Sequence, residues 1–341
     1  IKQRVVKREM PPWTADAPHG VFKNDPRLSQ KEIDTIAAWV DAGSPRGEGR
    51  DLPAAPTFTD GWTIGKPDAI FTMTEDFKVP ADGTIPYQYI RVPTHLTEDK
   101  WIQAIEFRPS NPKVVHHIIA SAQPAGGAVN DERTPGRVGL GGITPNMPGE
   151  TYDRGVARKL PANYEIILQM HYTTNGAATS DRTSIGVIYA KEPPKKMLGG
   201  GMILNIGFTI PPGADNHEVK ATQVLATDTV LTHLMPHMHM RGKDMTYVAY
   251  YPDGRSETLL SVPKYLFDWQ IVYELAEPKV LPKGTRIEVT AHFDNSPKNA
   301  YNPDPTQTVR WGDQTWEEMM IGFITTLVDP SAAATPTGGQ Q

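Results

Sequence analysis

Hydrophobic and polar positions follow two different periods along this chain, and the first is helical. Between residues 30 and 42 the apolar side chains recur at i, i+3, i+4 and i+7, which places them on one helix face. These side chains are Ile33, Ile36, Ala37 and Val40. The letters SQKE at the start form a capping box, and a glycine and a proline follow the run. The pattern predicts a helix over about 30–42.

The second period begins near residue 62, where short apolar runs alternate with turn residues as β-strands do. The strand candidates are 69–74, 87–93, 101–109, 114–123, 164–174, 183–190, 202–210, 229–242, 245–252, 257–263, 267–275, 285–294 and 317–328. The Asp-Gly pair in "YPDGRS" predicts a tight hairpin. The pattern predicts an all-β chain of two tandem antiparallel β-sandwich (jelly-roll) domains behind a short N-terminal helical segment.

Segments of different composition suggest where these domains end. Residues 46–60 and 191–201 are rich in glycine and proline and predict a linker and a second boundary. A long Gly/Pro-rich loop is expected over about 123–160. The expected parts are an N-terminal piece at 1–50, sandwich domains at 56–195 and 200–328, and a small, polar, disordered tail at 329–341.

Composition removes several classes of function. The chain of 341 residues carries a net charge of −5 and no basic cluster, so a nucleic-acid partner is not expected. No apolar run approaches the roughly 18 residues of a membrane span. The chain has no cysteine, which excludes disulfides, thiolate zinc sites and covalent haem attachment within it. No signal peptide is visible and the first residue is Ile1, so we expect a processed or cut piece of something longer.

Histidines in the predicted strands are the candidate chemistry. His237 and His239 have i, i+2 spacing, which directs both rings to one face of a strand and allows them to share a metal. A pair of exposed strand histidines is the plain alternative, and some metal-dependent hydrolases also carry this spacing.

Three further histidines lie in the first predicted domain. His116 and His117 are adjacent, so a regular strand would send them to opposite faces. A bulge or different rotamers would be needed to bring both rings to one ion. His171 lies in another strand, where a buried histidine is more often a satisfied core residue than a ligand.

Met319 is the candidate soft ligand. A methionine in an apolar run is usually core filler. As a partner of a histidine pair it gains meaning, because a thioether suits Cu(I) and is poor for Mg, Ca or Zn. Histidine with methionine therefore points to copper that changes oxidation state.

The order of these motifs resembles one known family. The chain carries HH, QMHY, HMH and EEM in sequence, together with "PHMHMRGKD" and "RWGDQTWEEM". It is similar to the copper type II monooxygenases, the group of peptidylglycine α-hydroxylating and dopamine β-monooxygenases, and most to their bacterial branch. The resemblance covers about 56–328.

The resemblance implies two copper ions and their ligands. A three-histidine electron-transfer copper would be held by His116, His117 and His171 in the first domain. The oxygen-activating copper would be held by His237, His239 and Met319 in the second, which makes these three the expected catalytic residues. Gln169 matches a glutamine near the first copper. The implied reaction hydroxylates a C–H bond of a small molecule with O2 and two one-electron reducing equivalents.

The chain departs from the peptide-hydroxylating members where those bind a substrate carboxylate. The matching positions are Met235, Ile321 and Phe323, all apolar, which predicts a neutral or apolar substrate. Arg241 is either a polar contact for the substrate or a solvated strand end. The animal enzymes are disulfide-rich, so packing alone must hold these domains.

The first 50 residues have a resemblance of their own. "REMPPW" and "DPRLSQKEIDTIAAWVDAGSPRG" look like the C-terminal half of a class I cytochrome c domain, in which Met10 would be the axial haem ligand. The CxxCH motif is absent, so haem c would belong to a fuller protein. The helix at 30–42 is free in that case to pack on the copper domains. The electron donor would be ascorbate or a cytochrome, and the location periplasmic or secreted.

Two other functions fit the same residues. One is a non-catalytic copper-binding or electron-transfer protein on the same scaffold. The other is a zinc hydrolase that uses the histidine pair and is indifferent to the loss of the Met319 thioether.

Overall fold

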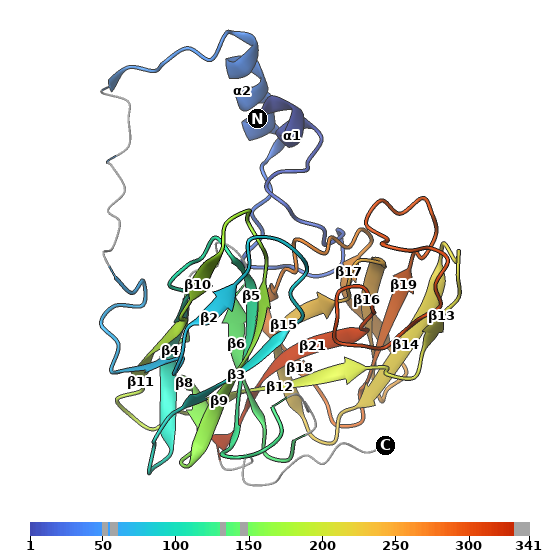
Figure 1. Ribbon diagram of the computed structural model, residues 1–341. Coiled ribbons are helices and arrows are strands. Elements are labelled where there is room, and N and C mark those ends of the chain that lie inside the picture. The colour runs from blue at the N-terminus through green and yellow to red at the C-terminus, as the bar shows by residue number, and fades with distance from the viewer. Residues whose placement is uncertain (50–53, 55–60, 130–133, 144–148, 331–341) are drawn as a thin grey trace. The chain divides into compact units, whose positions relative to one another are not determined.

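The computed structural model describes residues 1–49, 54, 61–129, 134–143 and 149–330 (Figure 1). Strands make up most of the described chain, and the two helices recorded there are short. The predicted all-β class with a small N-terminal helical part is confirmed. The predicted linker at 46–60 and the predicted disordered tail lie largely outside the described residues.

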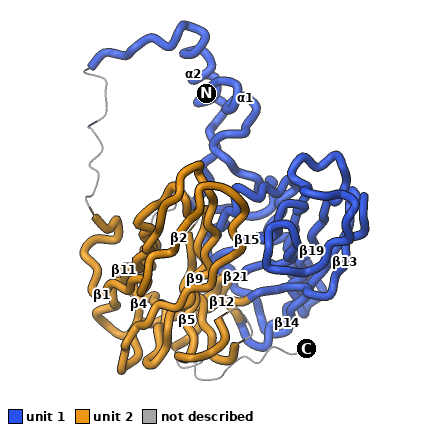
Figure 2. The backbone as a smooth tube through the Cα atoms, viewed as in Figure 1, with its two compact units in different colours: residues 1–59, 202–228, 232–324 blue, residues 60–201, 229–231, 325–341 orange. Residues whose placement is uncertain are grey.

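The chain forms two compact units (Figure 2). Unit 1 consists of residues 1–59, 202–228 and 232–324, and unit 2 of residues 60–201, 229–231 and 325–341. Strands β12 (Lys196–Leu204), β15 (Thr229–His237) and β21 (Ile321–Val328) contribute residues to both units.

Unit 2 contains two antiparallel sheets and a small strand pair. The first sheet has the order β1 (Ala69–Thr72), β11 (Ser184–Tyr189), β4 (Lys100–Arg108), β8 (Val156–Leu160), then β12, with β7 (Glu150–Thr151) beside β4. The pairing of β12 with β8 is parallel. The second sheet has the order β3 (Gln88–Pro93), β9 (Tyr164–Tyr172), β5 (Val115–Pro124), β6 (Val138–Ile143). Strands β2 (Phe77–Val79) and β10 (Thr179–Asp181) pair separately.

The core of unit 2 lies between its two sheets. One buried cluster joins Ile105 and Val187 of the first sheet to Ile118 and Leu168 of the second. Two sheets that bury their apolar faces against each other form a β-sandwich.

Unit 1 is built in the same way. One sheet has the order β14 (His217–Val224), β19 (Arg286–Phe293), β16 (Gly242–Tyr250), β17 (Ser256–Val262), and facing strands follow the order β21, β15, β18 (Tyr273–Leu281). Strands β13 (Thr209–Ile210) and β20 (Val309–Arg310) form a separate pair.

Gly322 shows how closely the two layers of unit 1 approach. A Cβ added to this β21 residue would lie 2.8 Å from Val289 Cγ2 and 2.9 Å from Tyr247 Cε1. Those side chains come from β19 and β16, so β21 packs face to face on the four-stranded sheet. Any larger residue at position 322 would push the layers apart.

The predicted helix is confirmed as α2 (Gln30–Asp41). Its capping box is formed as expected, because Ser29 accepts from the Glu32 backbone N–H and the Glu32 carboxylate accepts from the Ser29 backbone N–H. Helix α2 packs with α1 (Lys2–Val6), which the sequence pattern did not predict. Val5 and Ile33 are the buried residues of the two helices.

Residues 13–24 join the N-terminal part of unit 1 to its sandwich. Phe22 forms an antiparallel bridge with Leu275 of β18, and the Ala276 N–H donates to the Val21 carbonyl. Trp13 packs edge-on against Tyr273, with ring centroids 4.9 Å apart. This segment extends the sheet beyond β18.

Two sequence predictions need correction. The expected loop at 123–160 contains β6, β7 and β8. The glycines of this segment suggested a loop, but a β-ladder is formed by backbone groups and can include glycine. Gly142 lies so close to the neighbouring strand that a Cβ there would be 2.1 Å from the Ile118 carbonyl oxygen. The strand expected at 267–275 begins only at Tyr273, and the residues before it form a loop.

The hairpin predicted from "YPDGRS" joins β16 to β17. The Gly254 N–H donates to the Tyr251 carbonyl, and the Tyr251 N–H donates to the Arg255 carbonyl. The prediction is therefore confirmed, with a loop of three residues between the paired positions.

Candidate metal centres

A β-bulge brings His116 and His117 to the same place. In the pairing of β5 with β9, Val115 lies opposite Tyr172 and His117 lies opposite His171, so His116 is an extra residue on its strand. An extra residue interrupts the strict alternation of side chains. The bulge that the adjacent histidines required is present.

The three imidazoles converge in unit 2. Ligand nitrogens of His116, His117 and His171 all lie within 4.8 Å of one another. The Nδ1 atoms of His116 and His117 are 3.2 Å apart. Two nitrogens that each lie about 2.0 Å from a tetrahedral metal would be separated by roughly 3.3 Å. This group could bind a metal ion, which would replace the proton between the two Nδ1 atoms.

His171 is in the protonation state that metal binding needs. Burial, together with the smaller effect of the neighbouring His116, lowers the pKa of His171 to about 4. The imidazole is therefore neutral at pH 7. Its Nδ1 is buried and has no hydrogen-bond partner among the described residues. A buried ring nitrogen without a hydrogen-bond partner, on one of three converging imidazoles, fits a metal ligand.

Aromatic and amide side chains support this cluster. The Tyr87 ring meets His171 and His117 edge-on, with centroid distances of 5.0 and 5.5 Å. Gln169 lies two positions before His171 on β9 and donates to the Tyr89 hydroxyl at 2.8 Å. The Tyr87 ring thus packs on two of the three imidazoles, and the Gln169 bond to Tyr89 joins β9 to β3 beside them.

In unit 1, His237 is the last residue of β15 and His239 lies two residues beyond the strand, with the two ring centroids 5.3 Å apart. The Nδ1 of His237 is 2.7 Å from Gln270 Oε1, and the Gln270 amide nitrogen donates to the Phe267 carbonyl. The amide is thereby oriented with its oxygen toward the ring, so His237 Nδ1 carries the proton. The Nε2 of His237 is left as the atom that can bind a metal.

His239 is oriented in the same sense. Its Nδ1 lies 3.3 Å from the Glu317 carbonyl oxygen, which can only accept, so Nε2 is again the available ligand atom. Burial lowers the pKa of His237, which keeps that ring neutral. Two imidazoles whose Nδ1 atoms are bonded to protein acceptors form a typical half of a metal site.

Backbone contacts fix the His-Met-His segment itself. The Tyr265 hydroxyl accepts from the Met238 N–H at 3.1 Å and donates to the Met238 carbonyl at 2.6 Å. The Glu318 carboxylate accepts from the backbone N–H groups of His239 and Arg241, at 2.8 and 2.6 Å. These contacts place residues 317–319 beside the histidine pair.

Met319 lies in that adjoining segment, directly after Glu318, and is 3 % exposed. Glu318 is fully buried, and burial raises its pKa, while the hydrogen bonds that its carboxylate accepts from the backbone N–H groups of Arg241 and His239 lower that pKa. The nearby guanidinium of Arg241 opposes this rise.

Arg241 differs from the prediction. It is 1 % exposed, so the alternative of a solvated strand end is wrong. Its Nε donates to Asn295 and an Nη donates to the Trp316 carbonyl. The side chain is bound within the protein rather than turned to solvent because it compensates the buried carboxylate of Glu318.

Apolar side chains lie near the second histidine pair. The Phe323 ring centroid is 6.0 Å from that of His237, and the Phe267 centroid is 6.3 Å from that of His239. Met235 lies two residues before His237 on β15 and is half-buried, while Ile321 starts β21 and is buried. The surroundings of this pair are aromatic and aliphatic.

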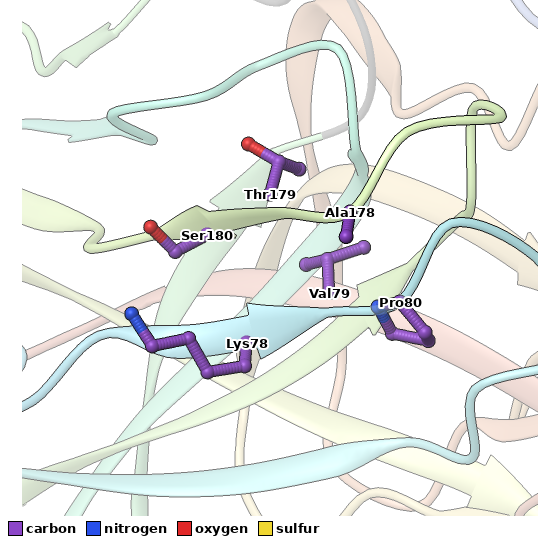
Figure 3. A pocket seen from close by; sticks show the side chains of 6 residues that line it. All are labelled: Lys78, Val79, Pro80, Ala178, Thr179 and Ser180. Atoms are coloured by element: carbon purple, nitrogen blue, oxygen red, sulfur yellow. The ribbon is translucent and has the colours of Figure 1, made fainter.

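Other candidate features are less informative. Met10 is 42 % exposed in the N-terminal segment. A shallow hollow lies between β2 and β10, lined by Lys78, Val79, Pro80, Ala178, Thr179 and Ser180 (Figure 3). Lys78 is the only one of these side chains that ionises, and none is a histidine or a carboxylate. None of the described helices has the length and apolar character to cross a bilayer.

Sequence reasoning missed Gln270, Tyr265 and Glu318. Nothing in the sequence marks Gln270, which lies in the strand predicted at 267–275, or Tyr265, which lies between two predicted strands. Glu318 stood in the EEM motif beside Met319 and could have been suspected from that adjacency.

No protein-family model matches the sequence, and no curated protein matches it. Among solved structures, the chain is similar to the major capsid protein P2 from bacteriophage PM2, with 8 % identity over 76 % of this chain and 97 % of that one and a TM-score of 0.32. It is also similar to the infectious bursal disease virus VP2 subviral particle, at 12 % identity, 84 % and 77 % coverage and a TM-score of 0.23. Allantoicase from Saccharomyces cerevisiae matches at 10 % identity, 64 % and 79 % coverage and a TM-score of 0.21. These likenesses are distant, and nothing about the two histidine groups follows from them.

Proposed function

We propose that the protein is a copper-dependent monooxygenase that hydroxylates a C–H bond of a small, neutral or apolar organic molecule. The oxidant is O2, and two one-electron reducing equivalents come from ascorbate or a cytochrome. The observation that carries the proposal is the pair of histidine groups, one in each unit, in which imidazoles converge or lie side by side with their rings held by the protein. Copper, when bound, supplies one-electron chemistry and O2 activation.

The residues of unit 2 suit a copper that only exchanges electrons. Imidazole is a good ligand for copper in both oxidation states. The bulge at His116 and the packing of Tyr87 hold the three rings in place, so little reorganisation would accompany a change of metal charge.

The residues of unit 1 suit the reacting centre. His237 and His239 offer two Nε2 atoms, and we assign the third ligand to the Met319 thioether, which favours Cu(I). Phe323 and Phe267 surround the pair with apolar surface that would bind an apolar substrate and exclude water. Gln270 keeps the proton of His237 on Nδ1.

Haem is assigned no step. Covalent attachment of a c-type haem needs thiols, and the 341 residues contain no cysteine. Met10 as an axial ligand would therefore need a haem held by another part of a longer protein.

The test begins with copper stoichiometry. The protein is loaded with copper, loosely bound ions are removed, and the metal is quantified in the parent, in Met319→Leu and in His171→Ala. Leucine keeps the volume of methionine, so the loss of the sulfur is separated from the loss of packing. We expect two coppers in the parent, a weakened second copper in Met319→Leu, and a weakened first copper in His171→Ala.

Activity is then sought with ¹⁸O2, a reductant and a panel of small apolar molecules. Incorporation of one labelled oxygen atom into a product, lost in Met319→Leu and in His237→Ala, is the expected result. Two coppers without product formation would favour a copper-binding or electron-transfer protein. Tightly held zinc that ignores the Met319→Leu change would favour a hydrolase and contradict the proposal.

A further inference from the structure

We propose that Glu318 is a positioning residue that sets the geometry of the second copper site, an inference that rests on the proposed function. Its carboxylate binds the backbone N–H groups of His239 and Arg241, while Met319 is the next residue along the chain. One side chain thereby connects a histidine ligand to the methionine ligand across a sequence separation of 79 residues.

Both oxygens of Glu318 are engaged. Oε2 accepts from His239 at 2.8 Å, and Oε1 accepts from Arg241 at 2.6 Å. Two hydrogen bonds to two residues of the same segment fix its orientation as well as its distance. The side chain is fully buried, so water does not compete for these bonds.

The backbone of Glu318 is held on the other side. Its N–H donates to the Arg310 carbonyl at 3.2 Å, and its carbonyl accepts from the Gly312 N–H at 3.1 Å. Residue 318 is thus a fixed point between β20 and the His239 segment.

Arg241 adds a second connection between the same two segments. Its guanidinium donates to the Trp316 carbonyl at 2.9 Å and to Asn295 Oδ1 at 2.8 Å. The amide of Asn295 in turn donates to the Pro211 and Gln307 carbonyls. The buried positive charge of Arg241 also compensates the negative charge of Glu318, because a buried carboxylate without such a partner would be strongly unfavourable.

These contacts act on the ligands rather than only on the fold. A displacement of Glu318 moves the backbone of His239 and of Met319 relative to each other, and these are two of the three proposed ligands. Loss of residues that orient metal ligands typically reduces metal affinity by about 10- to 100-fold. We expect an effect of this size at the second site and none at the first.

The experiment compares Glu318→Gln with Glu277→Gln. The amide introduced at position 318 can accept at one end only, because its NH2 group would face a backbone N–H. Glu277 is the matched control, since it is an exposed residue of β18 and the same chemical change is made there, away from the histidine pair. Cu(I) affinity is measured by competition with a chromophoric chelator, and the copper–sulfur contribution by X-ray absorption.

The expected result is specific to one site. In Glu318→Gln the affinity of the second copper falls by about 10- to 100-fold, and the copper–sulfur scattering decreases. The three-histidine site in the same molecules keeps its affinity and serves as an internal reference. Glu277→Gln behaves like the parent. A folded Glu318→Gln protein with parental affinity and copper–sulfur scattering overturns the inference.

A second variant separates positioning from a charge imbalance. Glu318→Gln leaves the positive charge of Arg241 buried without its partner, which could unfold unit 1. The double variant Glu318→Gln/Arg241→Gln removes both charges. If this double variant folds and binds the second copper more weakly than Arg241→Gln alone, the inference is supported; if the two variants bind it alike, the carboxylate does not position the site.

Failure of the proposed function would look different. In that case the parent itself would lack a second copper whose affinity depends on Met319. A parent with that copper, together with a Glu318→Gln variant that retains it unchanged, would overturn the positioning role alone.

Discussion

Replacing Gln270 by leucine tests how strongly one buried hydrogen bond governs a metal ligand. Gln270 Oε1 lies 2.7 Å from His237 Nδ1, and both residues are buried. Leucine is similar in size but offers no acceptor, so the Nδ1–H would remain buried without a partner. Such a group costs about 1–3 kcal/mol. The ring could escape the cost only by moving its proton to Nε2 or by turning.

Either change makes His237 Nε2 unable to bind the metal in its place, so the cost of the unpaired Nδ1–H appears as a lower affinity for copper. At 1.4 kcal/mol for each factor of ten, a penalty of about 1–3 kcal/mol lowers the affinity of the second copper by about 5- to 150-fold. Cu(I) competition titrations would measure this loss, with thermal unfolding of the copper-free protein run alongside.

Two variants act as controls for this prediction. Gln270→Glu keeps an acceptor at the same distance and should hold the second copper at least as well as the parent. Gln223→Leu makes the same chemical change at an exposed position of β14 and should leave both coppers unchanged. A folded Gln270→Leu protein that binds the second copper with parental affinity would refute the reasoning.

Three further predictions concern acid stability, the N-terminal segment and the substrate. The pKa of His171 is lowered from 6.5 to about 4 in the folded protein, so the unfolded chain binds more protons between these two pH values. The copper-free protein should therefore lose up to about 3 kcal/mol of stability as the pH falls from about 6.5 to 4. Urea unfolding across this range should show the loss, and His171→Asn should flatten it. Trp13→Ala should cost about 3–5 kcal/mol in stability, because the ring packs on Tyr273. It should also speed hydrogen exchange of the Ala276 amide, which donates to the Val21 carbonyl; unchanged exchange would contradict a role of Trp13 in holding residues 21–23 on β18. Phe323→Asn should raise the KM for an apolar substrate by about 5- to 100-fold with less effect on copper binding, and an unaltered KM would remove Phe323 from the binding surface.

The sequence was most informative where local chemistry decides the structure. The capping box at Ser29 and Glu32 and the Asp-Gly hairpin depend on residues within a few positions of one another, and both are present. Strand β14 was missed although Val219 and Ala221 alternate with polar residues, because the alternation of that segment is weak and it starts with a histidine. Glycine-rich β6 was read as a loop because its role depends on the neighbouring β5 backbone, which the segment itself does not reveal.

The histidine groups illustrate the same limit at the candidate sites. Their types and order could be read from the sequence, yet the means of bringing His116 and His117 together depends on the register of β5 against β9. Gln270 and Tyr265 reach the His237–His239 segment from a loop that follows β17, and Arg241 is buried by partners 54 and 75 residues away. Such partners are set by tertiary structure, so spacing along the chain does not predict them.

The short bridge at Phe22 also has a consequence for how this protein behaves in concentrated solution. Strand β18 is the last strand of its sheet, and an open strand edge invites pairing with another molecule. Residues 21–23 occupy the first half of that edge through the Lys23, Ala276 and Leu275 contacts, and Pro278 interrupts the second half. The N-terminal segment therefore acts as a cover against aggregation, and a chain shortened past residue 24 should self-associate as its concentration rises.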